Sequence, residues 1–209
     1  MLRAQAAALP PMSTDTPSTL PAASSRGLRY DPFAIALHWL LAVLIVGSFG
    51  VGLYMTGLPF SPLRLKVYNW HKWAGVTILA LSALRLLWRL GHRPPALPPG
   101  TSGLQKAGAR ISHTLMYLLF FAVPLSGWAY SSAMGMPVSW FGMLALPDFV
   151  STDHDFAEAV LQPLHRNCAF ALAGITLLHV AAALKHHWID RDGLLKRMWP
   201  GPRQESAGS

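Results

Sequence analysis

Residues 161–187, LQPLHRNCAFALAGITLLHVAAALKHH, form an apolar segment that is long enough to cross a bilayer and carries two histidines, His165 and His179. The two histidines are 14 residues apart. At 100° per residue this spacing comes within roughly 40° of a whole number of turns, so a helix places both on one face. At 1.5 Å per residue they stand roughly 21 Å apart along the axis. The segment therefore predicts one inward stripe with an imidazole near each membrane surface.

The composition of the whole chain is typical of a membrane protein. Of 209 residues, 52% are hydrophobic and only 12% are charged, and this charged fraction is about half that of a soluble domain. We expect four spans, at about residues 33–55, 68–90, 111–130 and 163–187. They predict an all-α fold, an integral membrane four-helix bundle. Pro163 suits the start of the last helix, and Pro124 suits a kink that neighbouring helices tolerate in the third.

The two ends of the chain differ from this central part. Residues 1–27 are rich in Ala, Pro, Ser and Thr and have no apolar run, so we expect a disordered tail without a cleavable signal. The first span should then insert and be retained. Residues 28–200 form the expected four-span domain, and residues 201–209 a short C-terminal tail. The single cysteine, Cys168, excludes an internal disulfide, a CxxC redox pair and a thiolate-rich metal site.

The basic residues predict the orientation in the membrane. Of the 17 lysines and arginines, all but four fall in the tails or on the side of the membrane that the tails share. The four on the opposite side are Arg64, Lys66, Lys72 and Arg166. We therefore expect both termini in the cytoplasm, and an even number of spans agrees. The net charge of +8 does not indicate nucleic-acid binding, because the basic residues flank apolar spans.

Five of the nine histidines lie in or at the start of a span, where an ionisable side chain marks a functional site by default. His38 and His179 fall at a similar depth near the cytoplasmic side, and His71 and His165 at a similar depth near the opposite side. Pairs of axial imidazoles in a four-helix bundle are a natural arrangement for haem. Zinc suits the pattern less well, because a structural zinc site needs four clustered ligands. His113, at the start of the third span, is left over.

Three roles are open for His113: a ligand that competes with His38, a contact to a haem propionate, or a contact to a quinone. Four small residues near the expected seam would let a flat macrocycle approach the backbone, although close helix packing explains each equally well. These are Gly47, Gly50, Gly75 and Gly174. The chain has no CxxCH motif, so any haem is expected to be b-type and held without a covalent bond.

Four stretches resemble the bacterial cytochrome b561 family. They are YDPFAIALHWLLA (30–42), WHKWAGVTIL (70–79), ARISHTLMYLLFFAVPLSGW (109–128) and the run from LHRNC to KRMWP (164–200). Members of this family are four-helix, di-haem b proteins of the bacterial inner membrane. The resemblance covers roughly residues 30–200 and implies that His38, His71, His165 and His179 are the haem ligands, in agreement with the depth argument. It also implies a multi-pass protein of the inner membrane.

The resemblance implies an activity as well, because the family includes a superoxide:ubiquinone oxidoreductase. We therefore expect an oxidoreductase with two non-covalent haem b groups. It would pass single electrons from a periplasmic donor, superoxide or a redox protein, to ubiquinone in the membrane. The alternative is a cytochrome b anchor subunit that relays electrons for a larger dehydrogenase or hydrogenase complex. A non-redox membrane scaffold would contain no haem.

Two roles are possible for the four basic residues on the periplasmic side. Arg64, Lys66, Lys72 and Arg166 all lie beside the His71 and His165 end, where a small positive patch could steer an anion such as superoxide. They could equally neutralise haem propionates. The third connection, residues 131–162, is acidic and works against a broadly positive surface.

Overall fold

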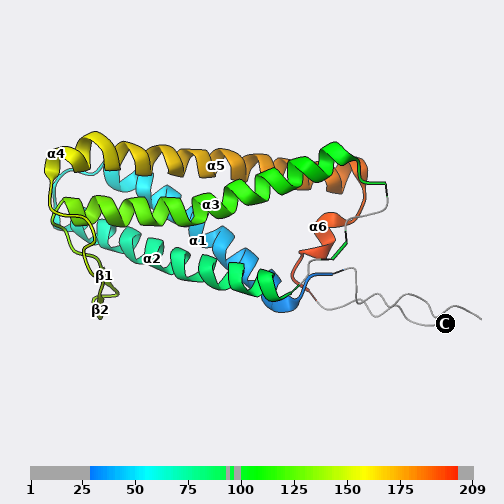
Figure 1. Ribbon diagram of the computed structural model, residues 1–209, viewed down its shortest axis with the longest axis horizontal. Coiled ribbons are helices and arrows are strands. Elements are labelled where there is room, and N and C mark those ends of the chain that lie inside the picture. Colours follow the sequence, from blue (N-terminus) through cyan, green and yellow to red (C-terminus); the bar gives the residue numbers. More distant parts are fainter. Residues whose placement is uncertain (1–28, 93–94, 97–99, 202–209) are drawn as a thin grey trace, which may run out of the picture.

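Four long helices form a bundle in the computed structural model, which describes residues 29–92, 95–96 and 100–201 (Figure 1). The helices are α1 (Pro32–Thr56), α2 (Pro62–Gly91), α3 (Gly103–Ala133) and α5 (Gln162–Lys185). Each is long and apolar enough to cross a membrane, α5 as part of a longer helical stretch, His154–Asp190. The expected four-helix membrane bundle is confirmed. The tail predicted at residues 1–27 and most of the one predicted at 201–209 lie outside the described residues.

Two helices begin earlier than hydropathy alone predicts, because capping residues lie before their apolar spans. The Ser61 hydroxyl caps α2 with Pro62 in its first turn, so this helix begins at residue 62 rather than 68. Ser102 and Gln105 form a capping box, so α3 begins at residue 103 rather than 111. In both cases side-chain oxygens satisfy backbone N–H groups that the first turn leaves without partners. The helices therefore extend beyond their apolar spans at these ends.

The α-helix α5 begins at Gln162 with Pro163 in its first turn, as predicted, but other helical turns precede it. The helical stretch begins at α4 (His154–Phe156), continues through a π-helical turn, η2 (Ala157–Leu161), and passes Pro163 into α5. Proline lacks an N–H group and its ring clashes with the carbonyl four residues earlier in a regular helix. The wider π-helical turn directly before Pro163 changes this spacing and so accommodates the ring. The third helix likewise runs through Pro124 without ending.

The two ends of the bundle are built differently (Figure 1). One end, here called the α6 end, gathers the start of α1, the end of α2 and the short helix α6 (Leu194–Arg197), which follows a second π-helical turn, η3 (His186–Asp190). The Tyr30 N–H donates to the Arg197 carbonyl at 3.3 Å, and Trp39 Nε1 donates to the Met198 carbonyl at 2.8 Å. These bonds hold the C-terminal segment against the start of α1.

The opposite end, here called the α4 end, carries a small element that the sequence analysis did not predict. Two short strands, β1 (Ser139–Trp140) and β2 (Leu144–Ala145), pair antiparallel, with Ser139 opposite Ala145. They lie in the third connection, residues 131–162. The hairpin projects from the side of the bundle next to α2 (Figure 1).

The sides of the bundle expose large apolar side chains, as lipid-facing helices do. Val43 on α1 is 68% exposed, and Leu118 on α3 is 61% exposed. One buried cluster is built mainly from small residues: Ala129, Ala133 and Ala157 pack with Leu161 where α3 meets η2. Small residues let helix backbones approach closely when lipid removes the hydrophobic driving force between helices.

A polar clasp fixes the turn after α5. His186 Nδ1 lies 2.6 Å from an Asp192 oxygen and 3.1 Å from an Asp190 oxygen. Lys185 Nζ contacts both Asp190 oxygens, at 2.8 and 2.7 Å. The contact between His186 and Asp192 ties η3 to the segment that leads into α6. The sequence analysis assigned His186 no such contact.

Candidate functional site

Four of the predicted histidines come together as two pairs, one toward each end of the bundle. His38 on α1 and His179 on α5 have ring centroids 6.3 Å apart, with planes at 69°. His71 on α2 and His165 on α5 have centroids 6.1 Å apart, with planes at 85°. Helix α5 thus contributes one imidazole to each pair, in the way that its 14-residue spacing predicts.

The separation within each pair suits two ligands of a single metal ion. Imidazole–metal bonds are about 2.0 Å and the ring centre lies about 1.1 Å beyond the nitrogen, so opposed ligands have centroids about 6 Å apart. The observed 6.3 and 6.1 Å are close to this value. Both pairs therefore fit axial coordination of a haem iron by position.

Backbone carbonyls orient both imidazoles of the pair at the α4 end. His71 Nδ1 lies 3.1 Å from the Ser48 carbonyl oxygen, and His165 Nδ1 lies 2.9 Å from the Val123 carbonyl oxygen. A carbonyl can only accept a hydrogen bond, so each Nδ1 carries the proton and each Nε2 keeps its lone pair. Metal-binding histidines usually donate their second nitrogen in this way. This pair fits iron ligation in its hydrogen bonding as well as in its position.

Two serine hydroxyls and two glycines complete the surroundings of the same pair. Ser48 Oγ lies 3.3 Å from His71 Nδ1, and Ser126 Oγ lies 3.4 Å from His165 Nδ1. A Cβ atom on Gly127 would lie only 2.9 Å from His165 Cε1, and one on Gly52 would lie 3.2 Å from His71 Cε1. Glycine at these two positions therefore makes room for the rings.

The glycines singled out from the sequence are different ones. A Cβ atom on any of them would meet nothing within 4 Å: Gly47, Gly50, Gly75 and Gly174. That they let a macrocycle approach the backbone stays a prediction.

A cavity of about 810 Å³ surrounds His71 and His165. Its walls come from α1, α2, α3 and α5 and are mainly apolar, and Lys72 and Arg166 are among the lining residues. Cofactor sites are typically cavities of this order, mostly apolar, with a few placed polar groups. The cavity can therefore accept a flat, largely apolar group between the two imidazoles.

The pair at the α6 end has a cationic neighbour. Arg85 Nη2 lies 3.3 Å from His38 Nδ1, and Arg85 Nη1 donates to the Ala34 carbonyl at 3.2 Å. Guanidinium has no acceptor, so His38 Nδ1 accepts and a neutral ring carries its proton on Nε2. His38 thus fits iron ligation by position. Binding through Nε2 further requires the proton to move to Nδ1 and Arg85 to release that atom.

His113 joins this end as a third imidazole. Its ring centroid lies 5.5 Å from that of His179, closer than the His38 centroid at 6.3 Å. The structure therefore groups His38, His113 and His179, and it leaves open the three roles considered for His113.

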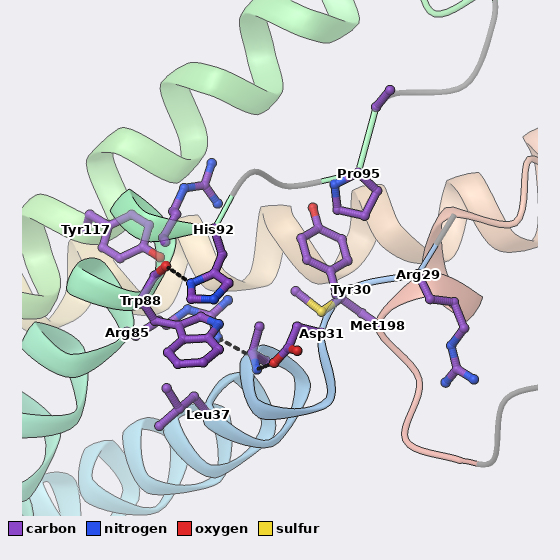
Figure 2. A pocket seen from close by; sticks show the side chains of 13 residues that line it. Arg29, Tyr30, Asp31, Leu37, Arg85, Trp88, His92, Pro95, Tyr117 and Met198 are labelled. Carbon is purple, nitrogen blue, oxygen red and sulfur yellow. Dashed lines mark hydrogen bonds between the residues drawn. The ribbon is translucent and has the colours of Figure 1, made fainter. Parts of the chain in front are cut away.

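A second cavity, of about 350 Å³, lies beside Arg85 at the α6 end (Figure 2). Its walls combine aromatic rings and cations, including Tyr30, Trp88, Tyr117, Arg29 and Arg89. His92 stacks on Trp88 with ring centroids 3.9 Å apart, and the Arg89 guanidinium lies 5.8 Å from the centre of the Tyr117 ring. Within the described residues, the buried Trp88 Nε1 has no hydrogen-bond partner. The cavity therefore offers flat apolar surfaces next to hydrogen-bond donors.

The four basic residues predicted for anion steering or propionate contact lie toward the α4 end but make separate contacts. Arg64 lies over Tyr68, Lys66 over Trp70 and Arg166 over Phe170, at 5.4, 5.3 and 5.9 Å from the ring centres. Lys72 Nζ donates to the Met136 carbonyl at 3.1 Å. Lys72 and Arg166 line the larger cavity, so these two cations are the ones placed to meet a molecule inside it.

Comparison with known proteins assigns this fold to a family. A family model described as Prokaryotic cytochrome b561 matches residues 29–201, which is most of the chain. The chain belongs to the prokaryotic cytochrome b561 family. Membership makes the protein a membrane cytochrome b with an electron-transfer role, and it implies haem b binding. The predicted resemblance is confirmed.

Curated relatives of this cytochrome match a similar share of the chain. The cytochrome is 36% identical over 174 residues to Cytochrome b561 homolog 2 of Escherichia coli (strain K12), a match that spans 81% of this chain and 90% of the relative. It is 29% identical over 175 residues to the Probable superoxide oxidase CybB of Yersinia pestis, across 84% of this chain and 98% of the relative.

The sequence analysis missed the residues of the cytochrome that hold its imidazoles. Ser48 and Ser126 are polar residues within apolar spans, and this pattern could have marked them as partners of a buried polar group. Arg85 had been assigned only to the cytoplasmic set of basic residues, although a cation inside a span usually has a partner. No sequence pattern distinguishes Gly52 and Gly127 from glycines that serve helix packing.

Proposed function

We propose that the protein is a di-haem b cytochrome that transfers single electrons from superoxide to ubiquinone. The observation that carries the proposal is the presence of two imidazole pairs that share helix α5, with centroids 6.3 and 6.1 Å apart. His38 with His179, and His71 with His165, would each hold one haem iron. Bound haem b supplies one-electron oxidation and reduction.

The chain's own groups prepare the α4-end pair for this role. The carbonyl oxygens of Ser48 and Val123 hold His71 and His165 in the tautomer that leaves Nε2 free. The cavity around them is mainly apolar, and a low local dielectric strengthens the polar contacts inside it.

Superoxide as the donor is supported by charge and by a relative. Lys72 and Arg166 line the cavity that holds His71 and His165, and Arg64 and Lys66 add positive charge on the same side. A cationic cleft raises the local concentration of an anion. A curated relative is named Probable superoxide oxidase CybB. Two superoxide anions would be oxidised to two molecules of oxygen, and their two electrons, with two protons, would convert one ubiquinone to ubiquinol.

Ubiquinone as the acceptor is supported by the cavity at the α6 end. The rings of Tyr30 and Tyr117 line this cavity (Figure 2). Arg89, which also lines it, can donate hydrogen bonds to quinone oxygens. His113 provides a further donor near His179. We assign the quinone head group to this region of the protein.

The orientation follows from the excess of basic residues at the α6 end and in the tails. We propose that both termini lie in the cytoplasm, that the α4 end faces the periplasm, and that the protein resides in the bacterial inner membrane. Superoxide would then be oxidised on the periplasmic side.

The experiment begins with the purified cytochrome in detergent. A reduced-minus-oxidised absorption spectrum and a haem assay should give b-type bands and two haems per chain. Addition of superoxide should then reduce the haems and convert added ubiquinone to ubiquinol, with two superoxide consumed per quinone. Superoxide dismutase in the same mixture should abolish the reaction.

The variant His165→Ala serves as the matched control, because it removes a proposed ligand and leaves the α6 end intact. It should retain one haem and lose the superoxide reaction. Two haems without any reaction with superoxide, together with co-purification of a large dehydrogenase subunit, would instead establish the membrane-anchor function. A wild-type preparation without haem would refute the proposal.

A further inference from the structure

The hairpin at the α4 end lies in a part of the third connection that carries no charge. Residues 135–147, GMPVSWFGMLALP, contain no Asp, Glu, Lys, Arg or His. The acidic residues of this connection come after it, beginning with Asp148. The connection therefore has an apolar half and an acidic half.

Three hydrogen bonds fix the position of the apolar half alongside α2. Lys72 Nζ donates to the Met136 carbonyl at 3.1 Å, and Trp73 Nε1 donates to the Ser139 carbonyl at 2.6 Å. Further along α2, Trp140 Nε1 donates to Thr77 Oγ1 at 3.1 Å. From Lys72 to Thr77 the helix advances about 7.5 Å toward its middle. The base of the hairpin therefore lies against a membrane-spanning helix, and the hairpin projects from the side of the bundle there (Figure 1).

The two strands of the hairpin pair with each other through backbone hydrogen bonds. The Leu146 N–H donates to the Val138 carbonyl at 2.8 Å, and the Met143 N–H donates to the Trp140 carbonyl at 3.0 Å. The turn needs two successive residues in the left-handed region, Phe141 (φ 51°) and Gly142 (φ 73°). A bulky residue rarely adopts such a φ. Here the Phe141 ring packs 5.3 Å from Trp73 and 5.5 Å from Trp140, measured between centroids.

The outer surface of the hairpin is apolar and uncovered within the described residues. Met143 is 87% exposed, Leu144 is 52% exposed and Phe141 is 50% exposed. These side chains lie beside α2, which is long and apolar enough to span the membrane and which Trp140 contacts at Thr77. Exposed apolar groups beside a membrane-spanning helix are typical of the boundary between head groups and acyl chains.

We propose that residues 137–146 form a hairpin inserted in the lipid leaflet at the α4 end, with Phe141, Met143 and Leu144 in contact with acyl chains. Its partner is the lipid surface. The hairpin thereby attaches the third connection to the membrane beside the cavity that holds His71 and His165, of which Met136 and Val138 form part of the wall.

The experiment uses the full-length cytochrome in phospholipid vesicles with one nitroxide label per chain. The single native cysteine is first removed with Cys168→Ser, and Met143→Cys then places the label on the hairpin. Leu118→Cys, in the middle of α3, is the lipid reference, and Ser151→Cys, in the acidic half of the same connection, is the water reference. The measurement is the collision rate of each label with oxygen, which concentrates in lipid, and with a water-soluble nickel chelate. A haem spectrum of each variant verifies its fold.

Lipid insertion predicts that the Met143→Cys label favours oxygen over the nickel chelate, as the Leu118→Cys label does, by at least tenfold relative to the Ser151→Cys label. Leu144→Cys should give the same result as a second position. A Met143→Cys label as open to the nickel chelate as Ser151→Cys would overturn the proposal in favour of a water-exposed loop. Shielding from both reagents would also overturn it, because it would show that protein covers the hairpin.

Discussion

A single methyl group added at Gly127 should weaken haem binding at one of the two proposed sites and leave the other unchanged. A Cβ atom there would lie 2.9 Å from His165 Cε1, whereas carbon atoms in contact are about 3.5–4.0 Å apart. In Gly127→Ala the imidazole must therefore retreat by roughly 0.6 Å. Val123, whose carbonyl holds His165 Nδ1 at 2.9 Å, lies one turn earlier on the same helix. Movement away from Gly127 therefore also stretches this hydrogen bond.

The expected loss of haem-binding free energy in Gly127→Ala is the difference between opposing effects. Alanine in place of glycine inside a helix stabilises the helix itself by about 0.8–1.0 kcal/mol. Overpacking costs about 1–3 kcal/mol, and the loss of a hydrogen bond costs about 0.5–1.5 kcal/mol. The unfavourable terms act on the position of His165 and exceed the helix gain. We expect the haem at the α4 end to bind more weakly by about 2 kcal/mol, or about thirtyfold.

The assay follows the transfer of haem from the purified cytochrome to an excess of apomyoglobin. Gly127→Ala should lose one of its two haems about thirtyfold faster than the wild type, while the other keeps its rate. The control is Gly108→Ala, on the same helix, where an added Cβ meets nothing within 4 Å. Unchanged loss from Gly127→Ala, or accelerated loss of the haem that depends on His179, would refute the reasoning.

Three other outcomes are expected. His179→Ala should remove chiefly the haem at the α6 end and His165→Ala the other one, so redox spectra of the two variants should show complementary losses; loss of the same haem in both would contradict the pairing. Arg85→Gln removes a cation 3.3 Å from His38, so the reduction potential of the haem at the α6 end should fall by at least about 59 mV, a tenfold change for one electron. A redox titration checks this, and an equal shift of both haems would argue against a local effect. Lys72→Gln should slow the reaction with superoxide and reduce its dependence on salt concentration, because it removes a steering charge; an unchanged salt dependence would exclude steering by Lys72.

The sequence by itself determined the four-helix architecture and the histidine pattern. In lipid every backbone polar group needs an internal partner, so an apolar stretch of sufficient length can only be a helix in a chain of this kind. Helical geometry then puts His165 and His179 on one face of α5. The order of the spans brings His38 to the depth of His179, and His71 to the depth of His165. These conclusions depend only on local periodicity and on the order of the spans along the chain.

The hydropathy pattern predicted the ends of the helices less well than their number. The second and third helices begin at capping residues outside the apolar spans, at Ser61 and Ser102. The fourth helical stretch passes Pro163 because a π-helical turn comes directly before it. Hydrogen bonds at a helix end or a change in helix type involve single atoms, and an average over twenty residues does not record them.

Contacts between different helices were decided only by the tertiary structure. Gly127 is special because α5 places the His165 ring against it, and Arg85 matters because α2 brings its guanidinium to His38 on α1. The base of the hairpin lies against α2 because Trp73 and Trp140 form hydrogen bonds across residues distant in sequence. The physical reason is the same in each case: a side chain's partner across a bundle depends on the rotation and packing of two helices, which the periodicity of either one leaves undetermined.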